Sequence, residues 1–396
     1  MRVSSLVMSG GGVIAALNGA LQKRVVLPTE TPLVPGNVHR IKEVQLGIGG
    51  KGQDVAIALS CLGYSKEKLK IAQFLGTGAE GDQVYEMLEE RVGKEAMSLT
   101  VRPKSKLRTC TSVVAADTTT ELIEPSGEIL SSEMSELLSK VEKVEGGTAA
   151  AVCIMGTMPP GCPTNSYADI YARSAGPGTL VVIDSVAGLE PLLLAIAKRK
   201  GEKGQTIFKV NASELCALAG VEKSNNEVDG INEEELLSAI TGFLTKNPVA
   251  KEVLKAIAIT DGKHPAHLAA LSDKEFQLYR IPVASLPKGT LFPIGAGDAV
   301  AAGLMASWQC LLEMEGASSS SAPCLPNDLQ EALQSQMKRL DISEDSSTLA
   351  MLTALSFGNA CGSASCLEEE NSVLRPKEVL TLFGKAKPAF VSSHGL

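Results

Sequence analysis

The feature of this sequence that most constrains its fold is the repeated alternation of short apolar runs with amphipathic stretches. The apolar runs are too short for helices and are bounded by glycine, proline or charged residues, which favours β-strands. The stretches between them have the periodicity of helices that bury one face. Strand followed by helix, many times over, is typical of an α/β fold with a largely parallel sheet.

This pattern predicts one domain, residues 1–396, with a central sheet flanked by helices. The expected strands are Ser5–Met8, Val13–Leu17, Lys70–Phe74, Ala149–Met155, Leu180–Asp184, Ile207–Val210, Ala256–Thr260 and Ala266–Leu271. The expected helices are Gln53–Leu62, Asp82–Arg91, Asn165–Ser174, Leu192–Lys200, Ser213–Ala219, Glu233–Leu244, Ala299–Leu312, Asn327–Lys338, Thr348–Ser365 and Pro376–Phe383.

Three segments interrupt the alternation of strand and helix. Residues 25–46 and 107–129 are polar and strand-like, contain turn residues and lack a good amphipathic helix, so we expect a small β layer that serves as a lid. Residues 314–347 contain a serine- and glycine-rich run at 316–323, which predicts a flexible insertion.

Composition excludes several classes of function. The net charge is −8 and aromatic residues make up 4%, so neither the clustered cations nor the stacking surfaces of a nucleic-acid-binding protein are expected. No apolar run is long enough to span a bilayer, and the first residues lack a secretory apolar region. We therefore expect a soluble, cytoplasmic protein; a removed organellar transit peptide stays open. Nine cysteines without Cys-x-x-Cys spacing indicate buried free thiols rather than a metal site.

The motif with the most chemical content is Gly295-Ala296-Gly297-Asp298, directly before a small-residue apolar helix. Amides of a glycine turn at a helix N-terminus bind anions, and an aspartate at that turn can take a proton from a hydroxyl. These are the parts that phosphoryl transfer needs, so Asp298 is the candidate catalytic base. The alternative is a glycine turn with an ordinary Asp cap.

A second glycine-rich segment, Gly47 to Gly52, precedes the helix expected at Gln53–Leu62. Its bare backbone can approach a polyol or a phosphate, which makes Gly49, Gly50, Lys51 and Asp54 candidate substrate-binding residues. The segment is not a P-loop, because Gly52 stands where that motif needs a hydroxyl. No acidic residue ends the next expected strand, so a dinucleotide site is not expected either. The alternative is a glycine linker.

The third motif is Lys209-Val210-Asn211-Ala212-Ser213-Glu214, where a strand gives way to a helix. Asn211 and Glu214 have the spacing of a capping box, which is the structural interpretation. The functional interpretation places Lys209 near phosphates and Glu214 on the water shell of a magnesium ion.

These three motifs, in this order, resemble those of the ribokinase-like (PfkB) carbohydrate kinase family, over about residues 13–365. The resemblance implies a three-layer fold with a β lid over the sugar, ATP and Mg²⁺ as cofactors, and Asp298 as the base. It also implies that Lys209, Asn211, Glu214 and Gly262 lie on the nucleotide side and that lids of two subunits meet in a dimer.

Further segments resemble the 1-phosphofructokinase and tagatose-6-phosphate kinase branch, whose substrates are phosphorylated ketohexoses. They are residues 17–21, 35–40, 119–122 and 156–161. By this resemblance Arg108, with help from Arg40, holds the substrate phosphate, for which a guanidinium is suited because it binds phosphate through two hydrogen bonds.

The departures from that branch cluster on the sugar side. Gln22 stands where the branch has Asp, Asp54 where it has Asn, and Pro293 where it has Thr; the segment Gly262 to Pro265 has lost its second glycine. The sequence thus predicts a kinase acting on a primary hydroxyl of a sugar or sugar phosphate, with altered hydroxyl contacts at Gln22 and Asp54. The alternative is a kinase-like binding or scaffold protein that has kept the fold and lost turnover.

Overall fold

The structure is a computed structural model. It describes residues 11–28, 30–116, 118–142, 148–199, 205–222, 230–287, 291–315, 323–340, 342 and 344–396. The strand expected at Ser5–Met8 and residues 316–322 of the serine-rich run lie outside the described residues.

The described residues form a ten-stranded main sheet in the order β14-β13-β12-β11-β10-β9-β8-β1-β4-β5. From β5 to β11 neighbouring strands are parallel, and from β11 to β14 they are antiparallel. The alternation therefore predicted the parallel part correctly. The strands are β1 (Gly12–Ala16), β4 (Leu69–Phe74), β5 (Thr100–Val101), β8 (Ala149–Met155), β9 (Ala175–Asp184), β10 (Thr206–Asn211), β11 (Ala256–Asp261), β12 (His264–Leu271), β13 (Glu275–Ile281) and β14 (Ala389–Gly395).

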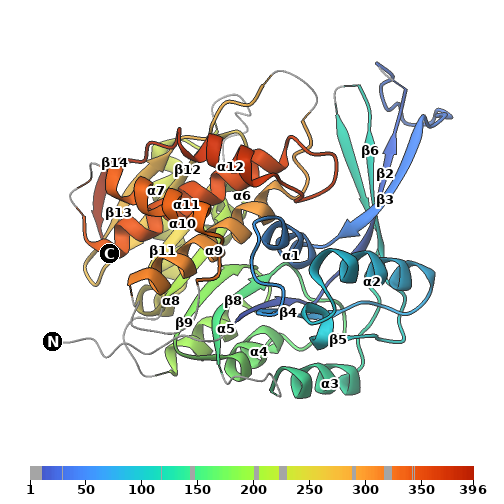
Figure 1. Cartoon of the computed structure of the whole chain (residues 1–396), viewed down its shortest axis with the longest axis horizontal. Coiled ribbons are helices and arrows are strands. Elements are labelled where there is room, and N and C mark those ends of the chain that lie inside the picture. Colours follow the sequence, from blue (N-terminus) through green and yellow to red (C-terminus); the bar gives the residue numbers. More distant parts are fainter. Residues whose placement is uncertain are drawn as a thin grey trace.

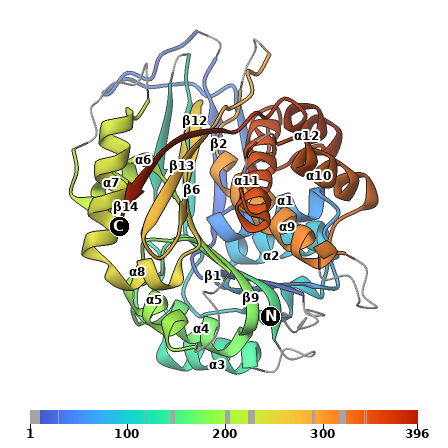
Figure 2. The same ribbon diagram turned by 90° about the vertical axis from the view of Figure 1, so that its left-hand side faces the viewer.

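Helices cover both faces of this sheet (Figures 1 and 2). Strand β1 shows why: Ile14 packs into one apolar cluster, whereas Val13 and Ala15 pack into the other. On the first face lie α1 (Lys51–Cys61), α2 (Ala79–Val92), α9 (Ala296–Glu315), α10 (Asn327–Arg339), α11 (Ser346–Ser365) and α12 (Pro376–Phe383). On the second lie α3 (Ser131–Glu142), α4 (Ser166–Ser174), α5 (Leu189–Ala197), α6 (Ala212–Ala219), α7 (Glu233–Lys246) and α8 (Pro248–Val253).

A separate small sheet stands beside the main body (Figure 1). Its order is β3-β2-β6-β7, from β2 (Ala20–Val26), β3 (Glu43–Gly49), β6 (Thr109–Val114) and β7 (Thr119–Ile123). The two segments expected to form a β layer, 25–46 and 107–129, supply most of it, but β2 begins earlier, at Ala20. Within 30–42 no strand is found.

Some elements differ from the expectation. The sequence analysis did not predict β5, β13, β14, α3 or α8. Helix α3 carried a visible signal, because its buried residues Met134, Leu137 and Val141 recur at helical spacing. Strand β14 carried little signal, because it is a largely exposed edge strand. Within the segment predicted to be a flexible insertion, α10 buries Leu329 and Leu333.

Among the described residues, no helix is long and apolar enough to cross a membrane. All nine cysteines have free thiols.

Candidate active site

The site is built around the first turn of α9. Gly295 has φ +81°, a conformation that L-residues with side chains rarely adopt, and it turns the chain into the helix. The N–H groups of Asp298 and Ala299 both donate to the carbonyl oxygen of Gly295, at 3.0 and 2.9 Å. This turn brings Asp298 to the end of the buried helix, with 9% of its surface exposed.

The amides of the turn are not equivalent. The N–H of Ala296 donates to the carbonyl oxygen of Pro293 at 3.1 Å. No hydrogen bond from the N–H of Gly295 or Gly297 is found within the described part of the chain. The expected anion-binding set of Gly295, Ala296 and Gly297 is thereby reduced to the two glycine amides.

Lys209, on β10, reaches this turn with its side chain although it is far from α9 in the sequence. A Cβ atom added to Gly297 would lie 3.3 Å from Lys209 Nζ. The side chain of Lys209 is buried, with 4% exposed. Lys209 and Asp298 are therefore both positioned at the turn that begins α9.

Asp184, at the end of β9, is a site residue that the sequence analysis missed. Its Oδ2 lies 2.5 Å from Lys209 Nζ and its Oδ1 accepts a hydrogen bond from Lys51 Nζ at 2.8 Å. Burial alone would raise the pKa of Asp184, but the charges of Lys209 and Lys51 lower it below its usual range. The available signal was its position, because carboxyl ends of parallel strands form the ligand-binding edge of such sheets.

Asn211 and Glu214 form the capping box that was one interpretation of their spacing. Asn211 Oδ1 accepts from the N–H of Glu214 at 2.8 Å, and Glu214 Oε2 accepts from the N–H of Asn211 at 3.2 Å. The cap does not use all of Glu214, since its Oε1 lies 3.7 Å from Lys51 Nζ. Glu214 therefore both caps α6 and lies near Lys51.

The pKa of the Asp298 carboxyl group is raised above its usual value. Burial, followed by the negative charge of Asp184, raises its pKa to about 7. Lys209 and Lys51 oppose this shift without cancelling it. A carboxyl group poised near neutral pH is suited to exchange a proton with a hydroxyl.

The second glycine segment lies at the start of α1. Gly50 has φ +115°, and a Cβ atom there would lie 3.0 Å from the Cα of Gly19, so the chain segments pass close together. Gly49 ends β3, where a Cβ atom would lie 3.3 Å from the Cβ of Gln22. Asp54, one turn into α1, is 4% exposed.

Two of the predicted substrate residues lie on the small sheet. Gln22 on β2 donates from Nε2 to Ser112 Oγ at 2.7 Å. Arg108, just before β6, donates to the carbonyl oxygen of Asn18 at 3.3 Å, and its Nε is buried without a partner among the described residues. Arg40 is exposed in the segment between β2 and β3.

Gly262 occupies the turn between β11 and β12, with φ +59° and open space on its Cβ side. Strand β11 pairs in parallel with β10, with Thr260 opposite Asn211. Gly262 is thus at the sheet edge that carries Asn211, on the side predicted for the nucleotide.

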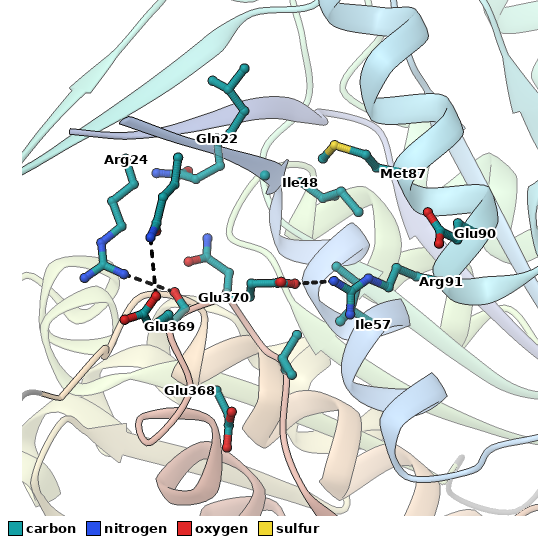
Figure 3. A pocket seen from close by; sticks show the side chains of 15 residues that line it. Gln22, Arg24, Ile48, Ile57, Met87, Glu90, Arg91, Glu368, Glu369 and Glu370 are labelled. Atoms are coloured by element: carbon teal, nitrogen blue, oxygen red, sulfur yellow. Dashed lines mark hydrogen bonds and ion pairs between the residues drawn. The ribbon is translucent and has the colours of Figure 1, made fainter. Parts of the chain in front are cut away.

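A cavity of about 640 Å³ lies between the small sheet, α1, α2 and the segment that follows α11 (Figure 3). Gln22 is part of its wall; Asp298 and Lys209 are not. Across it, Arg24 donates to the carbonyl oxygen of Glu369 at 3.3 Å, and Arg91 pairs with Glu370. Of the residues predicted to contact the sugar, only Gln22 lines this cavity, and the predicted base Asp298 does not.

The segment after α11 also contacts the glycine turn that begins α9. Ser372 Oγ donates to the carbonyl oxygen of Gly295 at 2.8 Å, and the N–H of Phe292 donates to the carbonyl oxygen of Cys366 at 2.9 Å. No local sequence pattern indicates these contacts, because the partners are more than seventy residues apart.

Comparisons with known proteins agree with the fold. Two tagatose-6-phosphate kinases from strains of Staphylococcus epidermidis are each 28% identical to the chain over 268 residues, which is 67% of this chain and 76% of theirs. Escherichia coli phosphofructokinase-2 in complex with fructose-6-phosphate shares the fold with TM-score 0.65 and 18% identity, over 95% of this chain and 98% of that one. Giardia lamblia ribokinase shares it with TM-score 0.61 and 16% identity, over 94% and 99%.

The model of the pfkB family carbohydrate kinases matches residues 16–322, which include all three motifs. The ribokinase-like fold, the order of the motifs and this match lead to one conclusion: the chain belongs to the pfkB family of carbohydrate kinases.

Proposed function

We propose that this kinase transfers the γ-phosphoryl group of ATP to a primary hydroxyl of a phosphorylated ketohexose, with Asp298 as the base. The observation that carries the proposal is the position of Asp298: it is buried at the glycine turn that also faces Lys209. The names of the Staphylococcus epidermidis relatives support a hexose phosphate as the acceptor class.

In the proposed reaction Asp298 removes the hydroxyl proton as the sugar oxygen attacks the γ-phosphorus. The new oxygen–phosphorus bond forms, the bond from the γ-phosphorus to the bridging oxygen breaks, and ADP leaves with that electron pair. The amides of Gly295 and Gly297 and the ammonium of Lys209 supply positive charge beside the transferred group. Asp298 starts this step as a carboxylate and ends it as an acid.

The residues at this edge fit a magnesium ion held through water. No cluster of three potential metal ligands is found within the described residues. Glu214 Oε1 is not used by the cap, and its side chain is 34% exposed, so it can accept a hydrogen bond from a metal-bound water. Magnesium would neutralise phosphate charge when bound; Glu214 and Asn211 would orient its water shell.

Arg108 is the proposed holder of the substrate phosphate. It faces a small cavity that Asn18, Lys106, Ser126 and Gly127 also line. Two cations and small neutral groups suit a dianionic phosphate. Asn18 and Gly19 line this cavity and also lie against Gly50 at the start of α1. The phosphate of the acceptor would then bind in this cavity, and its reacting hydroxyl would lie at the other end of the molecule, beside Asp298.

The small sheet is the proposed lid, and its outward face is the proposed dimer contact. Register puts Val44, Leu46 and Leu122 on the face opposite to Gln22 and Arg24. Their exposed fractions are 48%, 47% and 58%, which is a large apolar surface for one small sheet. Closure over the acceptor would exclude water and limit ATP hydrolysis.

The test is a panel assay. Coupled ADP release is measured with ATP-Mg²⁺ and fructose 6-phosphate, fructose 1-phosphate, tagatose 6-phosphate and their unphosphorylated sugars. We expect turnover with at least one phosphorylated ketohexose and at least tenfold lower kcat/KM with its unphosphorylated sugar. Nucleotide binding by thermal shift without turnover on any member would support the scaffold alternative instead.

A further inference from the structure

Asp54 is a buried acidic residue for which the phosphoryl-transfer step has no use. It lies on the first turn of α1, with 4% of its surface exposed. Its Oδ1 has no hydrogen-bond partner within the described part of the chain. A carboxylate in such a place loses its hydration without compensation, so burial favours the neutral acid.

The two lysines of the candidate site are paired with other carboxylates. Lys209 pairs with Asp184, and Lys51 pairs with Asp184 and Glu214. The remaining acidic neighbour of Asp54 is Asp298, whose negative charge acts on it. Neither Asp54 nor Asp298 forms an ion pair with these lysines. Ionising both buried carboxyl groups at once is unfavourable, so we expect one of the two to stay protonated.

Asp54 also faces the inner side of the small sheet. Asp54 is close enough to β6 that its charge, when it is ionised, raises the pKa of the Cys110 thiol. Cys110 is opposite Gln22 in the sheet register. Asp54 thus lies between the proposed base and the face of the small sheet where a sugar would be covered.

Other charged groups on the elements around α1 have partners elsewhere. Strand β1 has no titratable side chain, and Arg108 acts on Cys110 rather than on Asp54. The pairs on the neighbouring elements are Lys70 with Glu95, Arg102 with Asp82, and Arg91 with Glu370.

We propose that Asp54 works as a neutral carboxylic acid that donates a hydrogen bond to a hydroxyl oxygen of the acceptor sugar while Asp298 is ionised. This inference rests on the proposed function and assigns the protonation state of its acceptor site. An acid offers one O–H donor and a carbonyl acceptor, which are the two abilities of an amide, whereas a carboxylate only accepts. The direction of the Asp54 pKa, raised by burial and by Asp298, agrees.

The inference predicts a bell-shaped pH profile of kcat/KM. Activity rises as Asp298 loses its proton on the acid side and falls as Asp54 loses its proton on the alkaline side. Both limbs belong to the pair of carboxyl groups rather than to either one alone. In Asp54→Asn the alkaline limb is expected to disappear, while the acid limb remains.

One pH unit beyond the alkaline midpoint, activity relative to the maximum should be about tenfold higher in Asp54→Asn than in the unchanged protein. Asp54→Leu, which can neither donate nor accept, should raise KM for the sugar more than KM for ATP. The matched control is Asp82→Asn, an exposed carboxyl group on the first turn of α2, which should leave both limbs in place.

A second measurement does not require turnover. Infrared difference spectra of the ligand-free protein at mildly alkaline pH should show the C=O stretch of a carboxylic acid. The band should be lost in Asp54→Asn and kept in Asp82→Asn. An alkaline limb that persists in Asp54→Asn, or no acid band in the unchanged protein, overturns the inference. Failure of every sugar to react overturns the proposed function, but leaves the infrared result to decide the state of Asp54.

Discussion

Lys209 Nζ lies 2.5 Å from Asp184 Oδ2, and both side chains are almost fully buried, with 5% and 2% exposed. Two neighbouring parallel strands thereby share an ion pair beside the glycine turn that begins α9. Because Asp184 also binds Lys51, one carboxylate orients two ammonium groups.

Asp184→Asn should destabilise the fold, since it leaves Lys209 buried beside a neutral group. Breaking such a pair costs about 3–5 kcal/mol. The pKa of Asp184 is lowered in the folded state, so its contribution is present at neutral pH and is lost as pH falls through the folded value. Urea unfolding should therefore show a large difference at neutral pH and a smaller one in acid. Asp169→Asn, at an exposed helical pair, should cost less than about 1 kcal/mol.

Asp298→Asn should lower kcat by about 10²–10⁴-fold, the usual contribution of a general base. In the unchanged protein kcat/KM should fall as pH falls below about 7, because Asp298 then becomes protonated. Its folded pKa is raised, so ionisation above that value opposes folding, and Asp298→Asn should unfold at a higher temperature in alkaline buffer. Kinase assays and thermal melts across pH check both effects; kcat within tenfold of the unchanged protein would remove Asp298 as the base.

Glu214→Gln and Asn211→Ala separate the capping role from the proposed magnesium role. The glutamine can still accept from the N–H of Asn211, so the melting temperature should change little, while the Mg²⁺ concentration for half-maximal rate rises. Asn211→Ala removes the oxygen that caps α6 and should cost about 1 kcal/mol of stability. An unchanged magnesium requirement in Glu214→Gln would leave the cap as its sole function.

Arg108→Ala should raise KM for a sugar phosphate about tenfold to a hundredfold, since hydrogen bonds to charged groups are worth about 1.5–3 kcal/mol. The KM for an unphosphorylated sugar should hardly change. The exposed Arg40 provides a comparison, and Arg40→Ala should have a smaller effect. Steady-state kinetics on both substrate types measure this; an equal loss on both would show that Arg108 does not hold the phosphate.

Leu46→Glu combined with Leu122→Glu should convert a dimer into a monomer, because two charges would enter its apolar contact. Analytical ultracentrifugation over a range of concentrations measures the change. Leu194→Glu, on the exposed side of α5 with 42% exposed, is the matched control and should leave the dimer intact. A monomer at every concentration of the unchanged protein would contradict the proposed contact.

The sequence by itself determined most of the parallel part of the main sheet, most of its helices and most of the small sheet; β5 and the greater part of β2 were not predicted. It also named Asp298 and Lys209, because a glycine turn before an apolar helix and a lysine near a strand end are local patterns. Helical and strand periodicity depend on neighbours within a few residues, so a single sequence is enough to detect them.

Only the tertiary structure decided which of these groups meet. Asp184 joins Lys51 and Lys209 across three elements, and Ser372 reaches Gly295 from the far end of the chain. Burial likewise comes from the packed fold. Burial and the charge of a neighbouring carboxylate raise the pKa of both Asp54 and Asp298, and neither cause can be read from the local sequence. The local sequence pattern determines which side chains could take part in a site. Their burial and their contacts depend on segments that are far apart in the chain and meet only in the folded protein.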